Sequence, residues 1–207
     1  MPKKVDHDSR RRGIAEAVLR LAAAEGLESV SLRHVAAEAG ISMGAVQHYF
    51  RTKEEMLGFA GAHLAVRREE RITARFTAAG VVPTVRELVR VSALEVLPTD
   101  EASRADYLAG IAFFIRALRE PRIAARIAEG GQQLYSFFAT ELAKAKGTGE
   151  LAADADPYRE AVLLWSIVDG LSSSLALGEC TAEEASATIE YHIDRLFQPV
   201  SEPATLG

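Results

Sequence analysis

The apolar residues of this 207-residue chain recur every three or four positions through most of its length. That spacing places them on one face of a helix, and no run of alternating apolar and polar residues demands a strand. The first helix is expected from Ser9 until Gly26. Its apolar face is formed by Ile14, Ala17, Val18, Leu21 and Ala22. The pattern therefore predicts an all-α fold.

Two short helices joined by a tight turn are predicted between Val30 and Lys53. Their apolar positions are Leu32, Val35, Ala36 and Ala39 in the first and Val46 and Phe50 in the second. Gly40 supplies the left-handed backbone conformation that ends the first helix, and Ser42 offers a side-chain oxygen that caps the second. This is the layout of a helix-turn-helix. The pattern alone leaves open that two small helices meet at a glycine only for packing.

The second of these helices is expected to turn a mixed polar and small face outward. The residues of that face are Met43, Gly44, Ala45, Gln47 and His48. Such a helix suits the DNA major groove, because a Gln side chain can pair with adenine and Ala or Met can contact a thymine methyl group. Arg33, Arg51 and Lys53 are placed to contact phosphates, which gives affinity rather than sequence choice.

The run AAEAGISMGAVQHYFRTKEEML, which begins at Ala36, resembles the DNA-binding segment of tetracycline-repressor-like (TetR family) transcriptional regulators. The matching positions are Ala36, Gly40, Ser42, Gly44, Tyr49, Phe50, Lys53 and Leu57. The resemblance implies that Met43, Ala45, Gln47 and His48 read bases, and that Ser42, Tyr49 and Lys53 hold phosphates. Gln47 departs from the family, which usually has Tyr there. The operator preference of a better-known relative therefore does not carry over.

Beyond this segment the punctuation of the chain predicts six more helices. They are expected at 53 to about 76, 83–97, 101–118, 121–145, 157–176 and 182–197. Together with the resemblance, this predicts an N-terminal three-helix helix-turn-helix head joined to a C-terminal helical ligand-binding and dimerisation domain. The expected boundaries are 1–53 for the DNA-binding domain, 54–197 for the effector-binding and dimerisation domain, and 198–207 for a flexible tail.

Helices 157–176 and 182–197 are apolar over broad faces, so one face can serve the chain's own core and another can serve a partner. The resemblance implies that this pair forms a four-helix bundle with its copy in a homodimer. A dimer can set two reading helices in successive major grooves roughly 34–36 Å apart. The competing interpretation is that both stripes belong only to the core of a monomer.

The central helices combine aromatic and polar residues in segments expected to be interior, as small-molecule pockets do. The candidate ligand-binding residues are Tyr107, Phe114, Gln133, Phe138, Trp165 and Asp169. For any one of them, core packing is the competing interpretation. Gly130 and Gly131 are unusual inside a helix and indicate either a kink or the close approach of a ligand.

Charge is unevenly distributed along the chain. The net charge is −5, yet residues 1–53 carry nine Lys or Arg against six acidic residues, a net +3, and the remainder carries −8. A basic head can attract phosphate while an acidic body discourages non-specific binding. Arg10, Arg11 and Arg12 either form a solvated N-terminus or contact phosphate or the minor groove.

No secretion signal or bilayer-spanning apolar run is recognised, and Cys180 has no partner for a disulfide. The expected location is therefore the cytoplasm, with no membrane partner. The histidines lack metal-ligand spacing and there is no glycine-rich phosphate loop, so no metal, no cofactor and no enzymatic activity are expected.

The interpretation that follows is a ligand-responsive transcriptional regulator, most simply a repressor that a small molecule releases from a palindromic operator. One alternative is a DNA-binding dimer without an effector. The alternative from another class is a small helical enzyme.

Overall fold

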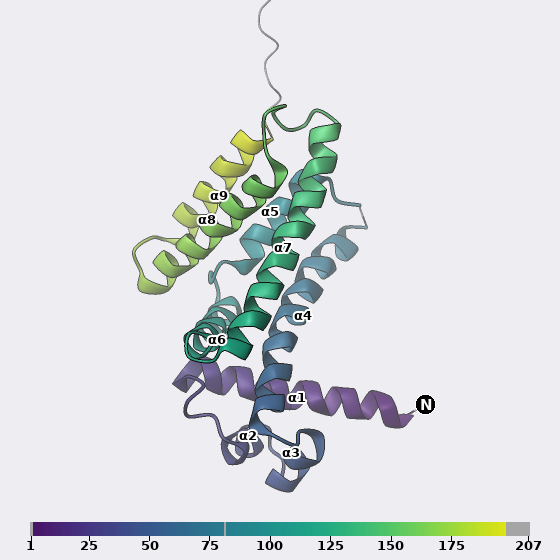
Figure 1. The fold of residues 1–207 in the computed structure, drawn as a ribbon, viewed down its shortest axis with the longest axis vertical. Helices are drawn as coiled ribbons and strands as arrows, with labels where there is room; N and C mark the ends of the chain where they lie inside the picture. Colours follow the sequence, from purple (N-terminus) through teal and green to yellow (C-terminus); the bar gives the residue numbers. More distant parts are fainter. Residues whose placement is uncertain (1, 81, 198–207) are drawn as a thin grey trace, which may run out of the picture. The chain divides into compact units, whose positions relative to one another are not determined.

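The computed structural model describes residues 2–80 and 82–197, and within them it contains nine α-helices and no strand (Figure 1). The helices are α1 (Pro2–Glu25), α2 (Leu32–Glu38), α3 (Met43–Tyr49), α4 (Lys53–Ala79), α5 (Val85–Val96), α6 (Glu101–Ala117), α7 (Pro121–Gly147), α8 (Pro157–Leu177) and α9 (Ala182–Leu196). The all-α prediction is confirmed. The tail expected at 198–207 lies outside the described residues.

The helix boundaries follow the local chemistry of caps and glycines. Ser42 Oγ accepts the Ala45 N–H at 3.1 Å at the start of α3, and Gly40 ends the preceding turn at φ +66°. Asp100 and Asp156 cap α6 and α8 in the same way. The main difference from expectation is α1, which begins at Pro2 rather than Ser9. Proline suits the first position of a helix, and no other breaker occurs in residues 3–12.

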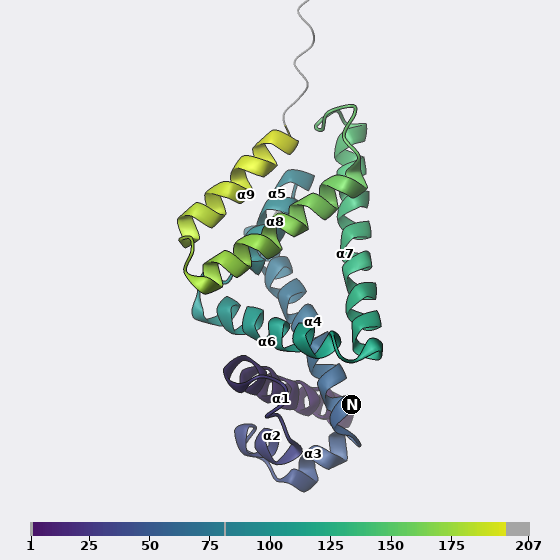
Figure 2. The same cartoon turned by 60° about the vertical axis from the view of Figure 1, so that its left-hand side comes forward.

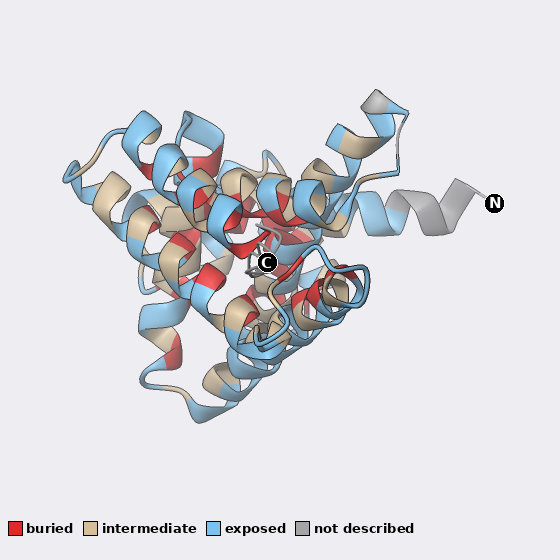
Figure 3. Ribbon diagram, turned by 90° about the horizontal axis from the view of Figure 1, so that it is seen from above, coloured by how far each residue is buried: buried red, intermediate tan, exposed pale blue. Residues whose placement is uncertain are grey.

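One compact unit comprises the chain up to Arg71 together with Pro98–Ile127. In it α1 packs against α6, and α2 and α3 contact each other and α1 (Figure 2). The buried core draws on all of these helices and on the first part of α4, with Ile14, Val18, Val35, Val46, Phe50, Met56 and Phe113 among its members. Buried positions lie along one side of individual helices and exposed positions along the other, as expected of amphipathic helices (Figure 3).

A charged cluster joins α1, α4 and α6 within this unit. Asp106 of α6 is only 2% exposed, and its carboxylate pairs with Arg67 and with Arg71, the latter at 2.8 Å. Arg67 also pairs with Glu16 of α1, which His63 contacts at 2.7 Å. Arg67 and Arg71 stand in a run of charged residues, 67–71, yet neither simply faces solvent, because a carboxylate buried this deeply must be paired.

The second compact unit comprises Ile72–Leu97 and the chain from Ala128 onward. In it α5, α8 and α9 contact one another, and Phe138 of α7 packs on Trp165 of α8 with ring centroids 5.1 Å apart. The stripes predicted on α8 and α9 supply much of the core: Ala161, Leu164, Trp165, Val168, Ala185, Ile189 and Ile193 are buried. Among the described helices, α8 is also long and apolar enough to cross a membrane. This is weak evidence for a membrane span, because core helices of soluble proteins have the same length and composition.

The two units do not follow the boundary expected between residues 53 and 54. Helix α6, which lies in the expected effector-binding range, belongs to the same unit as α1–α3, while α4 and α7 each contribute residues to both units. As a division of function, the boundary stays a prediction.

Two glycines allow a direct test of these local assignments. Gly40 has a positive φ, whereas Gly130 lies inside α7 with nothing within 4 Å of an added Cβ. Gly40→Ala should destabilise the protein by about 1 kcal/mol, because an L-residue is strained in the left-handed conformation. Gly130→Ala should stabilise it by about 0.5–1 kcal/mol, because alanine favours the helix. Chemical denaturation at one fixed protein concentration measures both, and effects of the same sign would contradict the assignment.

Candidate DNA-binding surface and effector region

Helix α3 turns one side into the core and leaves the other open. Val46 and the following Phe50 are fully buried, while Met43 is 47% exposed and Gly44, Gln47 and His48 are exposed as well. Ala45 is half-buried at the edge of the open side. All five residues predicted to read bases or to admit DNA therefore share one surface of a two-turn helix. An added Cβ at Gly44 would meet only Ser42 Oγ, at 3.9 Å.

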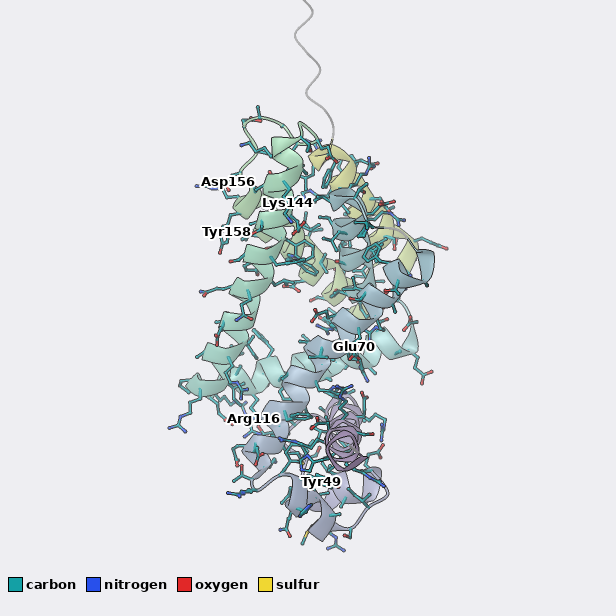
Figure 4. The ribbon with its side chains drawn as sticks, turned by 90° about the vertical axis from the view of Figure 1, so that its right-hand side faces the viewer. Tyr49, Glu70, Arg116, Lys144, Asp156 and Tyr158 are labelled. Carbon is teal, nitrogen blue, oxygen red and sulfur yellow. The ribbon has the colours of Figure 1, made fainter. Side chains whose placement is uncertain are left out.

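The residues expected at phosphates flank that surface at both ends of α3. Ser42 uses its oxygen as the helix cap, which leaves its O–H free to donate. Tyr49 is half-buried and lies beside α1 (Figure 4), where its ring is 5.0 Å from that of His7 and 5.2 Å from that of His48. Lys53 opens α4 and is half-buried, and Arg33 is exposed on α2. Their roles as phosphate contacts stay predictions.

Arg11 is a residue whose place the sequence interpretation missed. Its guanidinium lies over the rings of Phe50 and Phe59, and it pairs with Glu55 at 3.3 Å. The signal was present, because Arg11 continues the apolar stripe of Ile14 and Val18 at helical spacing. An arginine on the buried side of a helix can stack on aromatic rings instead of facing solvent.

The six candidate ligand residues fall into different environments. Tyr107 and Phe114 lie on α6 in the first unit, half-buried and 50% exposed respectively. In the second unit Phe138 and Trp165 are buried in mutual contact, whereas Gln133 and Asp169 are exposed. The expectation of an interior place is therefore met by only part of the set. Phe114 points outward because its neighbour Phe113 takes the buried side of α6.

Two hydrogen-bonding groups in the core of the second unit lack a partner among the described residues. They are the Nε1–H of Trp165, which is 5% exposed, and the hydroxyl of Ser172, which lies two turns further along the same face of α8. Buried polar groups are normally paired, so both are suited to a bound molecule or to water. Gly130 and Gly131 have nothing within 4 Å of an added Cβ, and neither marks a close approach between elements of the protein.

His192 of α9 has a buried Nε2 atom without a hydrogen-bond partner in the described part of the chain. Burial lowers the pKa of its imidazole below the ordinary value, which the nearby Glu160 carboxylate opposes and the positive charge of Arg195 reinforces. The folded protein therefore favours the neutral ring at this position.

Two family profiles match most of the chain. The profile described as "Bacterial regulatory proteins, tetR family" matches residues 14–58, and the profile described as "BetI-type transcriptional repressor, C-terminal" matches residues 83–198. The first covers the helix-turn-helix and the second covers α5–α9. Both describe transcriptional regulators and not enzymes.

Individual relatives agree with the profiles. The regulator PksA of Bacillus subtilis is 34% identical over 173 residues, which cover 83% of this chain and 81% of PksA. The regulator BetI of Burkholderia thailandensis is 30% identical over 201 residues, 96% of this chain and 99% of BetI. A solved structure of a transcriptional regulator from Saccharomonospora viridis in complex with choline has the same fold, with a TM-score of 0.78 at 21% identity, covering 90% of this chain and 96% of that one.

The lowered pKa of His192 has a consequence for stability. Because the folded protein disfavours protonation, the unfolded chain binds the proton first as pH falls through the ordinary value of 6.5, and stability is lost on acidification. His192→Gln should therefore reduce the loss of stability between about pH 7.5 and about pH 5.5. Denaturant midpoints at both pH values measure this, and an equal loss in the variant and the wild type would contradict it.

Proposed function

This chain belongs to the TetR family of bacterial regulatory proteins and is a DNA-binding transcriptional regulator, and we propose that it is a repressor released from a palindromic operator by a small molecule. The observation that carries the proposal is the open side of α3. Gln47 and His48 stand there beside Gly44 and Ala45, on a helix whose other side is fully buried. Such a surface offers hydrogen-bonding tips to base edges and lets the DNA approach the backbone.

A homodimer is the second part of the proposal. After α8 and α9 have supplied the core of their own unit, they still expose large apolar or aromatic side chains. These are Tyr158, Leu163, Leu177 and Tyr191. Exposed apolar positions on neighbouring helices are typical of a protein interface. A two-fold dimer through helices 157–176 and 182–197 would explain why a palindromic site is expected.

A small-molecule effector is the third part. The choline complex of the S. viridis regulator supports it as a feature of that protein, which shares the fold of this chain. Within this chain, the Trp165–Phe138 ring pair and the unpartnered Trp165 N–H provide an apolar wall with a hydrogen-bond donor. We propose that Gln133 and Asp169, which belong to the same unit, complete the region when ligand is bound. Tyr107 and Phe114 belong to the other unit, and their role as ligand contacts stays a prediction. A dimer without an effector is the alternative.

The mechanism that we propose is a shift between two conformations. Helix α4 begins at Lys53, directly after the helix-turn-helix, and ends in the second unit. A ligand that binds one conformation better favours it by its differential affinity. If that conformation changes the direction of α4, the two copies of α3 no longer fit adjacent grooves, and the repressor leaves the operator.

An operator is obtained by selecting genomic fragments with the purified protein, and footprinting should show a palindrome protected over two adjacent turns. On that operator Gln47→Ala should relax sequence preference at one or two base pairs, at about 1–3 kcal/mol, because it removes a base contact. Lys53→Ala should weaken all sequences alike and flatten the salt dependence, because it removes a phosphate contact. Quantitative binding to single-base variants of the site at several salt concentrations separates the two effects. An unchanged base preference in Gln47→Ala would show that α3 is oriented differently.

Effector and operator must oppose each other if release is allosteric. By linkage, operator DNA should weaken effector binding by the same factor by which the effector weakens operator binding. Choline is the first probe, followed by other small organic cations and neutral compounds, in isothermal titration with and without operator. Trp165→Phe, which keeps a ring but lacks the N–H, should bind the effector about tenfold more weakly. Equal affinities with and without operator would contradict the mechanism and favour the dimer without an effector.

A further inference from the structure

We propose that Arg11 is a positioning residue for DNA recognition, which holds the end of α3 and the start of α4 against α1 and does not contact DNA phosphate. The inference rests on the DNA-binding function. It separates Arg11 from its neighbours in the basic run of residues 10–12, which share its charge but not its surroundings.

The first observation is an aromatic sandwich. The Cζ atom of Arg11 lies 4.6 Å from the ring centroid of Phe50 and 4.5 Å from that of Phe59. The two rings are themselves 5.4 Å apart and tilted by 55°. A planar guanidinium stacks on aromatic faces with a favourable cation–π interaction. Phe50 directly follows α3 and Phe59 lies in α4, so one side chain of α1 contacts both helices.

The second observation is the carboxylate of Glu55, whose two oxygens serve two elements. Oε1 accepts from Nη2 of Arg11 at 3.3 Å, and Oε2 accepts from the backbone N–H of Arg51 at 2.9 Å. The N–H of Glu55 in turn donates to Oγ1 of Thr52 at 3.0 Å. Glu55 therefore ties Arg11 to the backbone of the corner between α3 and α4.

These contacts bear on recognition because α3 has only seven residues. A helix of that length is unstable alone and takes its orientation from its surroundings. Its first end is capped by Ser42, and its last backbone bond runs from the Phe50 N–H to the Val46 carbonyl. A displaced Phe50 would turn the last turn of α3, which carries Gln47 and His48, relative to the DNA. Arg11 thus influences base recognition from the side of the helix that the DNA does not reach.

Burial distinguishes Arg11 from a phosphate ligand. Its side chain is 25% exposed, and its Nε atom is buried. Arg12, the next residue, is 58% exposed and meets Glu70 only at 3.9 Å. Arg12 is therefore a matched control with the same charge, one position away, on the solvent side of α1.

The test compares Arg11→Met and Arg12→Met on a duplex that the wild-type protein selects from random-sequence DNA. Fluorescence anisotropy at several salt concentrations gives the affinity and its salt dependence, and a scrambled duplex gives the non-specific affinity. Arg11→Met should lose about tenfold in affinity for the selected duplex, with little change on the scrambled one and the wild-type salt slope. Arg11→Lys, which keeps the charge facing Glu55, should recover part of the loss. Arg12→Met should retain the wild-type preference for the selected duplex.

Three results would overturn the proposal. One is unchanged affinity in Arg11→Met. Another is a salt slope lower by about 0.9 than that of the wild type, which marks a lost phosphate contact. The third is an equal loss on both duplexes. If thermal melting shows that Arg11→Met does not fold, Glu55→Gln replaces it. This variant must then lose preference for the selected duplex at an unchanged salt slope, by less than the roughly tenfold loss expected of Arg11→Met. A wild-type protein that selects no duplex would contradict the DNA-binding function itself, a result distinct from these three.

Discussion

A two-turn helix gains too little from its own hydrogen bonds to persist in water, and much of this structure supplies what α3 lacks. The hydroxyl of Ser42 satisfies an amide at one end, and the burial of Val46 and Phe50 holds the middle and the other end. The open side of α3 makes no contact with this core. Val46 and Phe50 are instead buried against α1, α2 and the first turns of α4, on the opposite side of the helix. The arrangement of those helices is thus a condition for the surface that we propose binds DNA.

The two compact units solve the problem of burial in different ways. The unit that contains α1–α3 buries Asp106 and surrounds it with Arg67 and Arg71, so its helices are joined by charges as well as by apolar contact. A buried ion pair adds little net stability, but losing one partner leaves an unpaired charge in the interior, which is costly. The cluster therefore restricts which arrangements of α1, α4 and α6 are tolerable. The second unit relies on apolar and aromatic packing around Trp165 and Phe138.

The features that could be predicted from the sequence are those decided by residues close together in the chain, such as turns and helix caps. Gly40 and Ser42 act on backbone groups within a few residues, so the turn and the cap of α3 were predicted correctly. The surroundings of Asp106 could not be predicted, because its arginine partners are more than thirty residues away in the chain. Phe113 and Phe114 show a second limit, since adjacent aromatic residues must point to different sides and the pattern does not say which side is buried.

On the proposed DNA-binding surface, the demands on Gly44 come from the DNA and not from the packing of the protein. Glycine costs a helix about 1 kcal/mol relative to alanine. Nothing inside the chain requires the cost, because a methyl group at this position would rest in ordinary contact with Ser42 Oγ, 3.9 Å away. Its neighbour Val46 is in the opposite situation, enclosed by the core on every side. Gly44 and Val46 lie two residues apart on one short helix. Gly44 can therefore be replaced when the DNA sequence to be bound changes, whereas Val46 can be replaced only when the core around it changes.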